Sequence, residues 1–338
     1  MNDAIPRQPK APAEADEPAR IGVLERSRLL GQRIARVLRA ATRLGQVAVD
    51  EEPGGLRSAL GPSPALLVCE ASDIDLALEW AHDRYPSMSI AAFTTGDMGA
   101  LLEAARAEER LVALMSVPPF GSMPRPWELA WLARRVLQAE PAASHVQELL
   151  LWGSTSVKYR PRTSRERDLV VAEVQALSSR AGASARVSQR VGEVAHELLM
   201  NAMYDAPVDH YGNLVYSMDR KQDISLAAEE SPTFRFATDG MLIGLQVVDP
   251  FGRLLRHHVL NGIARGRSAA QGGSGYLDTS AGGAGLGLSR IYAHATSVLV
   301  DVAALRHTSL TAVFDLDIQP REARSVPSSL HLFAPGSL

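Results

Sequence analysis

The stretch "GGAGLGLSRIY" at residues 282–292 joins a bare glycine backbone to the immediate start of a helical pattern. Missing side chains let a phosphate group approach the backbone amides, and the N-terminus of the following helix adds partial positive charge. Two other phosphate-binding loops do not fit, because G-x-x-x-x-G-K-[ST] is absent and the glycines are spaced G-x-G-x-G rather than G-x-G-x-x-G. The stretch therefore predicts a loop that holds a polyphosphate.

Two motifs on the N-terminal side of this loop could bind the magnesium ion and the adenine of a nucleotide. In "HELLMNAMYDAP" (196–207), Glu197 and Asn201 lie four residues apart on a predicted helix and share a face. A carboxylate and an amide placed this way can hold hydrated magnesium, which keeps several waters and takes few protein ligands. In "VVDPFGRL" (247–254), a hydrophobic strand ends at Asp249, whose carboxylate can accept a hydrogen bond from the exocyclic amine of adenine.

Together the three motifs resemble the GHKL ATPase superfamily, which includes gyrase-type ATPases, histidine-kinase catalytic domains and anti-sigma-factor serine kinases. The resemblance covers residues 150–318 and implies an α+β ATP-binding (Bergerat) sandwich with ATP and Mg²⁺ as cofactors. It implies Glu197 as the catalytic, water-activating or general-base residue and Asn201 as the magnesium ligand. The residues that it implies for ATP binding are Asn201, Asp249, Gly252, Gly283, Gly285, Gly287 and Thr308.

Some details of the resemblance are specific to this chain. Thr311 is an alternative to Thr308 for the threonine near adenine, and Thr308 is preferred. The family motif D-x-G-x-G reads D-P-F-G-R at residues 249–253, so both family glycines are replaced and one is displaced. Residues 255–281 correspond to the family's mobile lid. Basic side chains border it and are interpreted as a phosphate clamp, a surface for an acidic partner or a solvated helix face: Arg253, Arg256, His257, His258, Arg265 and Arg267.

The local pattern of the second half agrees with an α+β domain over residues 156–318. A capping box, T-x-x-E, begins at Thr163 and predicts a helix to Gly182, and a second helix is predicted over 187–204. Strands 232–238 and 241–249 flank an Asp-Gly pair, a strong hairpin signal. Further strands are predicted at 156–160, 296–303 and 309–317, with a linker at 141–155 and a loose tail at 319–338.

The first half alternates short apolar runs with helical patterns, which predicts a doubly wound parallel sheet over residues 20–140. The predicted strands are 21–25, 46–50, 64–72, 89–95 and 111–117. The order and length of these elements resemble a flavodoxin-like response-regulator receiver domain, and another flavodoxin-like domain is the alternative. Residues 1–19 are rich in Pro, Ala and acidic side chains and are predicted to be disordered.

The receiver resemblance implies a phosphoacceptor site that this chain has lost. The family's acid pair after the first strand is Glu25-Arg26 here, and the acceptor position falls on Cys69 or Glu70. The hydroxyl after the fourth strand is kept as Thr94, but the family's lysine position falls on Val117. Because a basic residue repels magnesium and the acceptor aspartate is absent, we expect a pseudo-receiver that does not take up phosphate.

Composition restricts the environment and the partners. The 338 residues carry a net charge of −3, which gives no reason to expect nucleic acid or a membrane surface as a partner. One cysteine fits a reducing compartment, and the lack of a signal peptide and of an apolar run long enough to span a bilayer predicts a cytoplasmic protein.

These observations predict a cytoplasmic signal-transduction protein that binds Mg-ATP and a regulatory protein partner, with a homodimer left open. The strand–helix–helix start at 156–204 is most similar to the anti-sigma-factor serine kinases, so the chain is a candidate serine/threonine kinase or nucleotide-gated partner switch. A histidine autokinase is not expected, because the segment 121–155 offers only His145 and one clear helix. The alternative is a non-catalytic adaptor whose two domains bind proteins.

Overall fold

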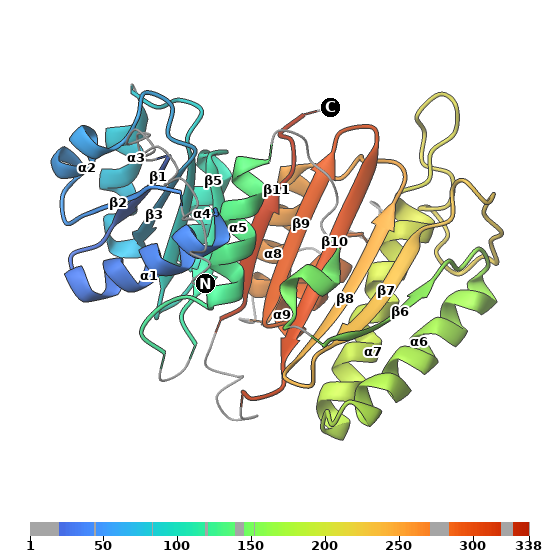
Figure 1. The fold of residues 1–338 in the computed structure, drawn as a ribbon. Coiled ribbons are helices and arrows are strands. Elements are labelled where there is room, and N and C mark those ends of the chain that lie inside the picture. Colours follow the sequence, from blue (N-terminus) through green and yellow to red (C-terminus); the bar gives the residue numbers. More distant parts are fainter. Residues whose placement is uncertain are drawn as a thin grey trace, which may run out of the picture.

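The computed structural model describes residues 20–43, 45–82, 84–118, 121–138, 145–151, 153–270, 284–318 and 327–337. Among these residues, eleven strands form one mixed sheet that runs through the whole molecule (Figure 1). The strand order is β2-β1-β3-β4-β5-β11-β9-β10-β8-β7-β6. No helix in this part of the chain is both long and apolar enough to cross a membrane.

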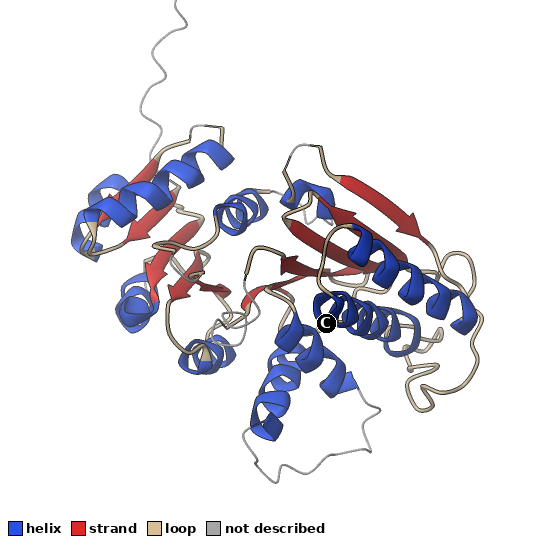
Figure 2. Cartoon of the chain, turned by 90° about the horizontal axis from the view of Figure 1, so that it is seen from below, coloured by secondary structure: helices blue, strands red, loops and turns tan. Residues whose placement is uncertain are grey.

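The N-terminal half is a parallel sheet with helices on both faces, as the alternating pattern predicted (Figure 2). Its order, 2-1-3-4-5, is one of the two common orders of doubly wound sheets. Buried residues of α1 and α5 pack on one face and those of α3 and α4 on the other. The elements are β1 (Ile21–Leu24), α1 (Arg28–Ala41), β2 (Val47–Asp50), α2 (Pro53–Ala59), β3 (Leu66–Glu70), η1 (Ala71–Asp73), α3 (Ile74–His82), β4 (Ser89–Thr94), α4 (Gly99–Ala107), β5 (Leu111–Ser116) and α5 (Pro126–Leu137).

The C-terminal half is a mainly antiparallel sheet with α6 and α7 along one face (Figure 2). The predicted capping box is confirmed, since the Thr163 hydroxyl accepts from the Glu166 amide and the Glu166 carboxylate accepts from the Thr163 amide. The predicted hairpin is also confirmed, and Gly240 supplies the positive φ of 87° that its turn requires. The elements are β6 (Thr155–Tyr159), α6 (Ser164–Arg180), α7 (Ala185–Met200), η3 (Asn201–Asp205), β7 (Thr233–Thr238), β8 (Leu242–Asp249), α8 (Arg256–Ala270), α9 (Ala284–His294), β9 (Ser297–Ala303) and β10 (His307–Asp315).

The prediction of a loose tail over residues 319–338 is wrong for its last part. Residues Ser329–Phe333 form β11, which pairs antiparallel with β5 and parallel with β9 and so joins the two half-sheets. Leu330 and Leu332 enter the core on one face, while His331 packs edge-on against Trp131 on the other. The segment is ordered because both of its neighbours are sheet edges that need a partner.

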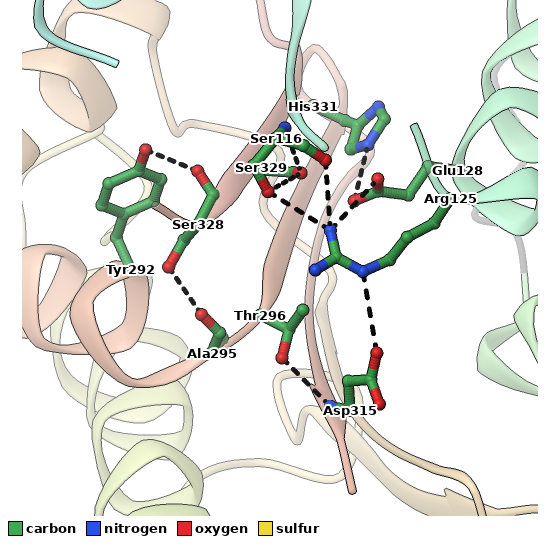
Figure 3. A network of polar contacts seen from close by, with 10 residues as sticks. All are labelled: Ser116, Arg125, Glu128, Tyr292, Ala295, Thr296, Asp315, Ser328, Ser329 and His331. Carbon is green, nitrogen blue, oxygen red and sulfur yellow. Dashed lines mark hydrogen bonds and ion pairs between the residues drawn. The ribbon is translucent and has the colours of Figure 1, made fainter. Parts of the chain in front are cut away.

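Polar contacts hold β11 at its start (Figure 3). The Ser116 amide donates to Ser329 Oγ at 3.0 Å, and Arg125 donates to the Ser116 carbonyl and hydroxyl. Glu128, which is fully buried, lies 3.6 Å from the Arg125 guanidinium and 3.7 Å from the ring of His331. The polar residues of β11 therefore have partners that come from a segment more than 200 residues earlier.

The prediction of a linker over residues 141–155 is also wrong in part. Residues 139–144 and 152 lie outside the described residues, but Val146–Leu149 form a short 3₁₀ helix, η2, whose apolar side chains are buried on the sheet. A Cβ added to Gly244 of β8 would lie 2.4 Å from Val146 Cγ2, so the glycine makes room for this helix. The segment covers the face of β7 and β8 that α6 and α7 leave open.

The first part of the expected lid is a fixed helix. Residues 271–283 lie outside the described residues, whereas α8 packs on α9 and reaches α4 in the other half. Arg256, expected as part of a phosphate clamp or partner surface, is 4% exposed. Its guanidinium donates to carbonyls of the N-terminal half and of β11: Ala105, Glu108, Leu111 and Leu332.

Replacing Arg256 with alanine is expected to lower the free energy of unfolding by about 2 kcal/mol, because several buried carbonyls lose a charged donor. Urea denaturation followed by circular dichroism measures this change. Arg265→Ala, an exposed position on the same helix, is the control and is expected to shift stability by less than about 0.5 kcal/mol. Equal stability of the two variants would contradict the bracing role of Arg256.

Candidate functional site

A cavity of about 610 Å³ opens in the C-terminal half, between the end of α7, the sheet and α8. This volume lies within the range of small-molecule sites. Three predicted site residues line it: Asn201, Asp249 and Thr308. Other lining residues include Asp205, Leu214, Met218, Arg253, His258, Asn261, Arg265 and Leu288.

Asp249 stands at the end of β8 and is fixed by its own turn. Its Oδ1 accepts hydrogen bonds from the amides of Phe251 at 2.9 Å and Gly252 at 3.4 Å. Burial raises the pKa of Asp249 to about 6, against the opposing effect of these amides and of a hydrogen bond from Thr308. The carboxylate is thus mostly ionised at neutral pH and can accept a hydrogen bond from a ligand in the cavity.

The structure places Thr308, and not Thr311, beside this carboxylate. Thr308 is paired with Asp249 across the antiparallel strands β8 and β10. Side chains three positions apart on a strand face opposite sides, and Thr311 accordingly lines a small hollow with Trp131 and His145 on the other face. The preference for Thr308 agrees with this geometry.

Gly252 does not line the cavity, contrary to its predicted role in ligand binding. It adopts a positive φ of 63°, and an added Cβ would lie 2.3 Å from the Ala303 carbonyl. Its own carbonyl accepts from the Leu305 amide at 3.0 Å. Gly252 therefore lets the turn after Asp249 pack closely on the turn between β9 and β10, and acts on the cavity only through Asp249.

The helix that carries Asn201 ends in a π-helical turn. The Ala206 amide donates to the Asn201 carbonyl at 3.0 Å, a spacing of five residues. Such turns are rare and frequent at functional sites. The wider turn brings Asp205 into the cavity wall beside Asn201. Sequence reasoning gave Asp205 no site role, because an ideal α-helix offers no signal of this turn.

Glu197, Asn201 and Gly287 meet where α9 crosses α7. A Cβ added to Gly287 would lie 2.7 Å from Glu197 Oε2 and 3.3 Å from Asn201 Oδ1, so a larger residue would require these side chains to shift. Gly285 lies in the first turn of α9, and Gly283 lies outside the described residues. Glu197 is buried but does not line the cavity, and its carboxylate is paired with Arg290.

The side chains expected to hold magnesium or activate water each face an arginine. Arg220 donates to Asn201 Oδ1 at 3.4 Å and to Asp205 Oδ2 at 3.0 Å, and Arg290 contacts Glu197. Among the described residues, no group of three or more His, Cys, Asp or Glu side chains is placed to hold a metal ion. In this arrangement the residues do not fit the magnesium site that the resemblance implied.

In the N-terminal half, an arginine likewise lies beside the acidic side chains that follow β1 and β3. Glu25 is buried after β1, and the guanidinium of Arg26 contacts Asp73. Burial, with Glu70 and Asp73 nearby, raises the pKa of Glu25. Cys69 is a fully buried strand residue, and burial raises the pKa of its thiol.

No protein-family model and no curated protein matches this chain. Among solved structures, it is similar to a chain in the crystal structure of the SiaB–SiaC complex from Pseudomonas aeruginosa, with 17% identity and a TM-score of 0.30. The match covers 47% of this chain and 88% of that chain. A similarity of this degree does not establish a shared activity.

Proposed function

We propose that this chain is a nucleotide-gated signalling protein, with a GHKL-like ATP-binding half and an N-terminal pseudo-receiver. The observation that carries the proposal is the pairing of Asp249 and Thr308 in the wall of a ligand-sized cavity. A buried carboxylate beside a hydroxyl supplies the acceptor that the exocyclic amine of adenine requires. Asn201 lies in the same wall, on the side toward α9.

The glycine-rich start of α9 supports the placement of the phosphates. Gly285 stands in the first turn of this helix, whose free amides and dipole favour an anion. Gly287 lets the same turn lie against Asn201. Adenine at Asp249 and phosphates at the N-terminus of α9 would place the nucleotide along the cavity.

Helix α8 supports a gating role, because it touches both the cavity and the other half. His258, Asn261 and Arg265 line the cavity. Asn261 also accepts from Arg106 of α4 at 3.2 Å, and Arg267 is paired with Asp97 at 2.9 Å. A ligand that moves α8 would therefore change contacts with the pseudo-receiver half, which is the surface we propose for a regulatory protein partner.

The position of Glu197 does not favour turnover of the nucleotide. A general base needs a carboxylate within reach of the reacting group, whereas Glu197 is paired with Arg290 and lies outside the cavity wall. The pairing of Glu197 with Arg290 favours nucleotide binding and gating over kinase activity. The same pairing also fits the alternative function, a non-catalytic adaptor.

The proposal predicts that ATP raises the unfolding temperature and that Asp249→Asn reduces the effect. The substitution can put a donor where adenine requires an acceptor, so affinity is expected to fall about tenfold, as expected for loss of one hydrogen bond to a charged group. Scanning fluorimetry and titration calorimetry measure both quantities. Asp75→Asn, an exposed position on α3, is the control. Failure of ATP to bind the wild-type chain would refute the proposed function.

A further inference from the structure

Two basic side chains line the cavity, together with the carboxylates of Asp205 and Asp249. Arg253 and Arg265 line the cavity, and neither forms an ion pair among the described residues. A polyphosphate entering this space would therefore meet two guanidinium groups. Arginine binds phosphate through charge-assisted, often paired hydrogen bonds, which are among the strong ones in proteins.

A third guanidinium stands behind the cavity wall. Arg220 comes from the loop between η3 and β7, and its side chain is 19% exposed. It reaches the oxygens of Asn201 and Asp205, the two side chains that would offer oxygen ligands to a cation at this wall. In a partly desolvated place such a charge acts more strongly than in water. Arg220 therefore places a positive charge beside Asn201 Oδ1, the oxygen that was expected to bind the metal ion.

The unsatisfied atoms at this wall are chiefly donors. Asn201 Nδ2 and Arg220 Nε are buried and have no hydrogen-bond partner. Buried donors require an acceptor, and phosphate oxygens are acceptors, whereas a metal ion or its bound water would not accept from them. Asp205 Oδ1 also lacks a partner, but the other oxygen of this carboxylate is already paired with Arg220.

We propose that the polyphosphate is held by arginine and amide donors rather than through a divalent cation, so that ATP binding does not require magnesium. Arg220 supplies the positive charge behind Asn201, and Arg253 and Arg265 supply it in the walls. This inference rests on the proposed function, because it concerns the same cavity. It replaces the magnesium ion of the sequence-based expectation with side chains of the chain itself.

The test is titration calorimetry of the full chain with ATP, once in excess EDTA and once in excess Mg²⁺. Affinities within about threefold of each other are expected, since magnesium is not part of the site. Binding that is lost in EDTA and restored by Mg²⁺ would overturn this inference and leave the proposed function standing. Lack of binding in both buffers would refute the proposed function and this inference with it.

Two substitutions test whether Arg220 supplies the positive charge behind Asn201. Arg220→Gln is expected to weaken binding in EDTA about tenfold, because it removes the positive charge behind the cavity wall. Lys221→Gln, an exposed neighbour with the same change in charge, is the control and is expected to leave affinity unchanged. Unchanged affinity in Arg220→Gln would overturn the role of Arg220. If that variant does not fold, the comparison of EDTA with Mg²⁺ in the wild-type chain still tests the inference.

Discussion

Leu330→Asp is expected to lower the free energy of unfolding by about 5 kcal/mol, the largest effect on stability in this set. Leu330 is fully buried in β11, paired with Leu114 on one side and Val298 on the other. The substitution removes a core side chain and places a carboxylate in the apolar cluster around it. Because whole domains are stable by only 5–15 kcal/mol, much of the chain is expected to unfold at room temperature in moderate urea.

The measurement is urea denaturation followed by far-ultraviolet circular dichroism and by tryptophan fluorescence. Ser337→Asp, at an exposed position beyond β11, introduces the same charge and is expected to change stability by less than about 0.5 kcal/mol. Wild-type stability in Leu330→Asp would mean that β11 does not join the half-sheets. Leu330→Ala, with an expected loss of about 3 kcal/mol, separates the missing side chain from the added charge.

Local periodicity was sufficient to predict most elements of both halves. Alternation of apolar runs and helical stretches predicted β1 to β5 and their helices, and turn residues predicted the β7–β8 hairpin. Strand β11 was missed although its sequence, SLHLF, alternates polar and apolar residues as a strand does. Its buried polar residues lie against Ser116 and Glu128, which are far away in the sequence. Tertiary context of this kind leaves no local signal.

The candidate site could likewise be predicted from the sequence only in part. Asn201, Asp249 and Thr308 could be predicted because each motif has its own local chemistry, and they share one cavity. The position of the arginine beside these side chains could not be predicted from the sequence. Arg220 belongs to a loop without periodicity, and its position beside Asn201 depends on how that loop folds back on η3.

Both halves show one departure from the resemblances that the sequence suggested. Arg26 contacts Asp73 at the acidic edge of the N-terminal half, and Arg220 contacts Asp205 at the cavity. Arg26 and Asp73 are 47 positions apart, and Arg220 and Asp205 are 15 apart, so neither contact could be predicted from local periodicity.

Gly287→Val is expected to weaken ATP binding by roughly a hundredfold, the largest effect on the proposed site. The branched side chain would begin 2.7 Å from Glu197 Oε2 and 3.3 Å from Asn201 Oδ1, so these two side chains or α9 itself have to shift. Overpacking of this kind costs on the order of 3 kcal/mol, which corresponds to the loss of affinity if α9 carries the phosphates. Calorimetric titration with ATP measures the change, after circular dichroism has shown that the variant is folded.

Ala293→Val, exposed on the same helix, controls for the lower helix propensity of valine and is expected to bind normally. A folded Gly287→Val chain with wild-type affinity would place the phosphates away from α9, and the cavity would then need a ligand bound through Asp249 and Thr308 alone.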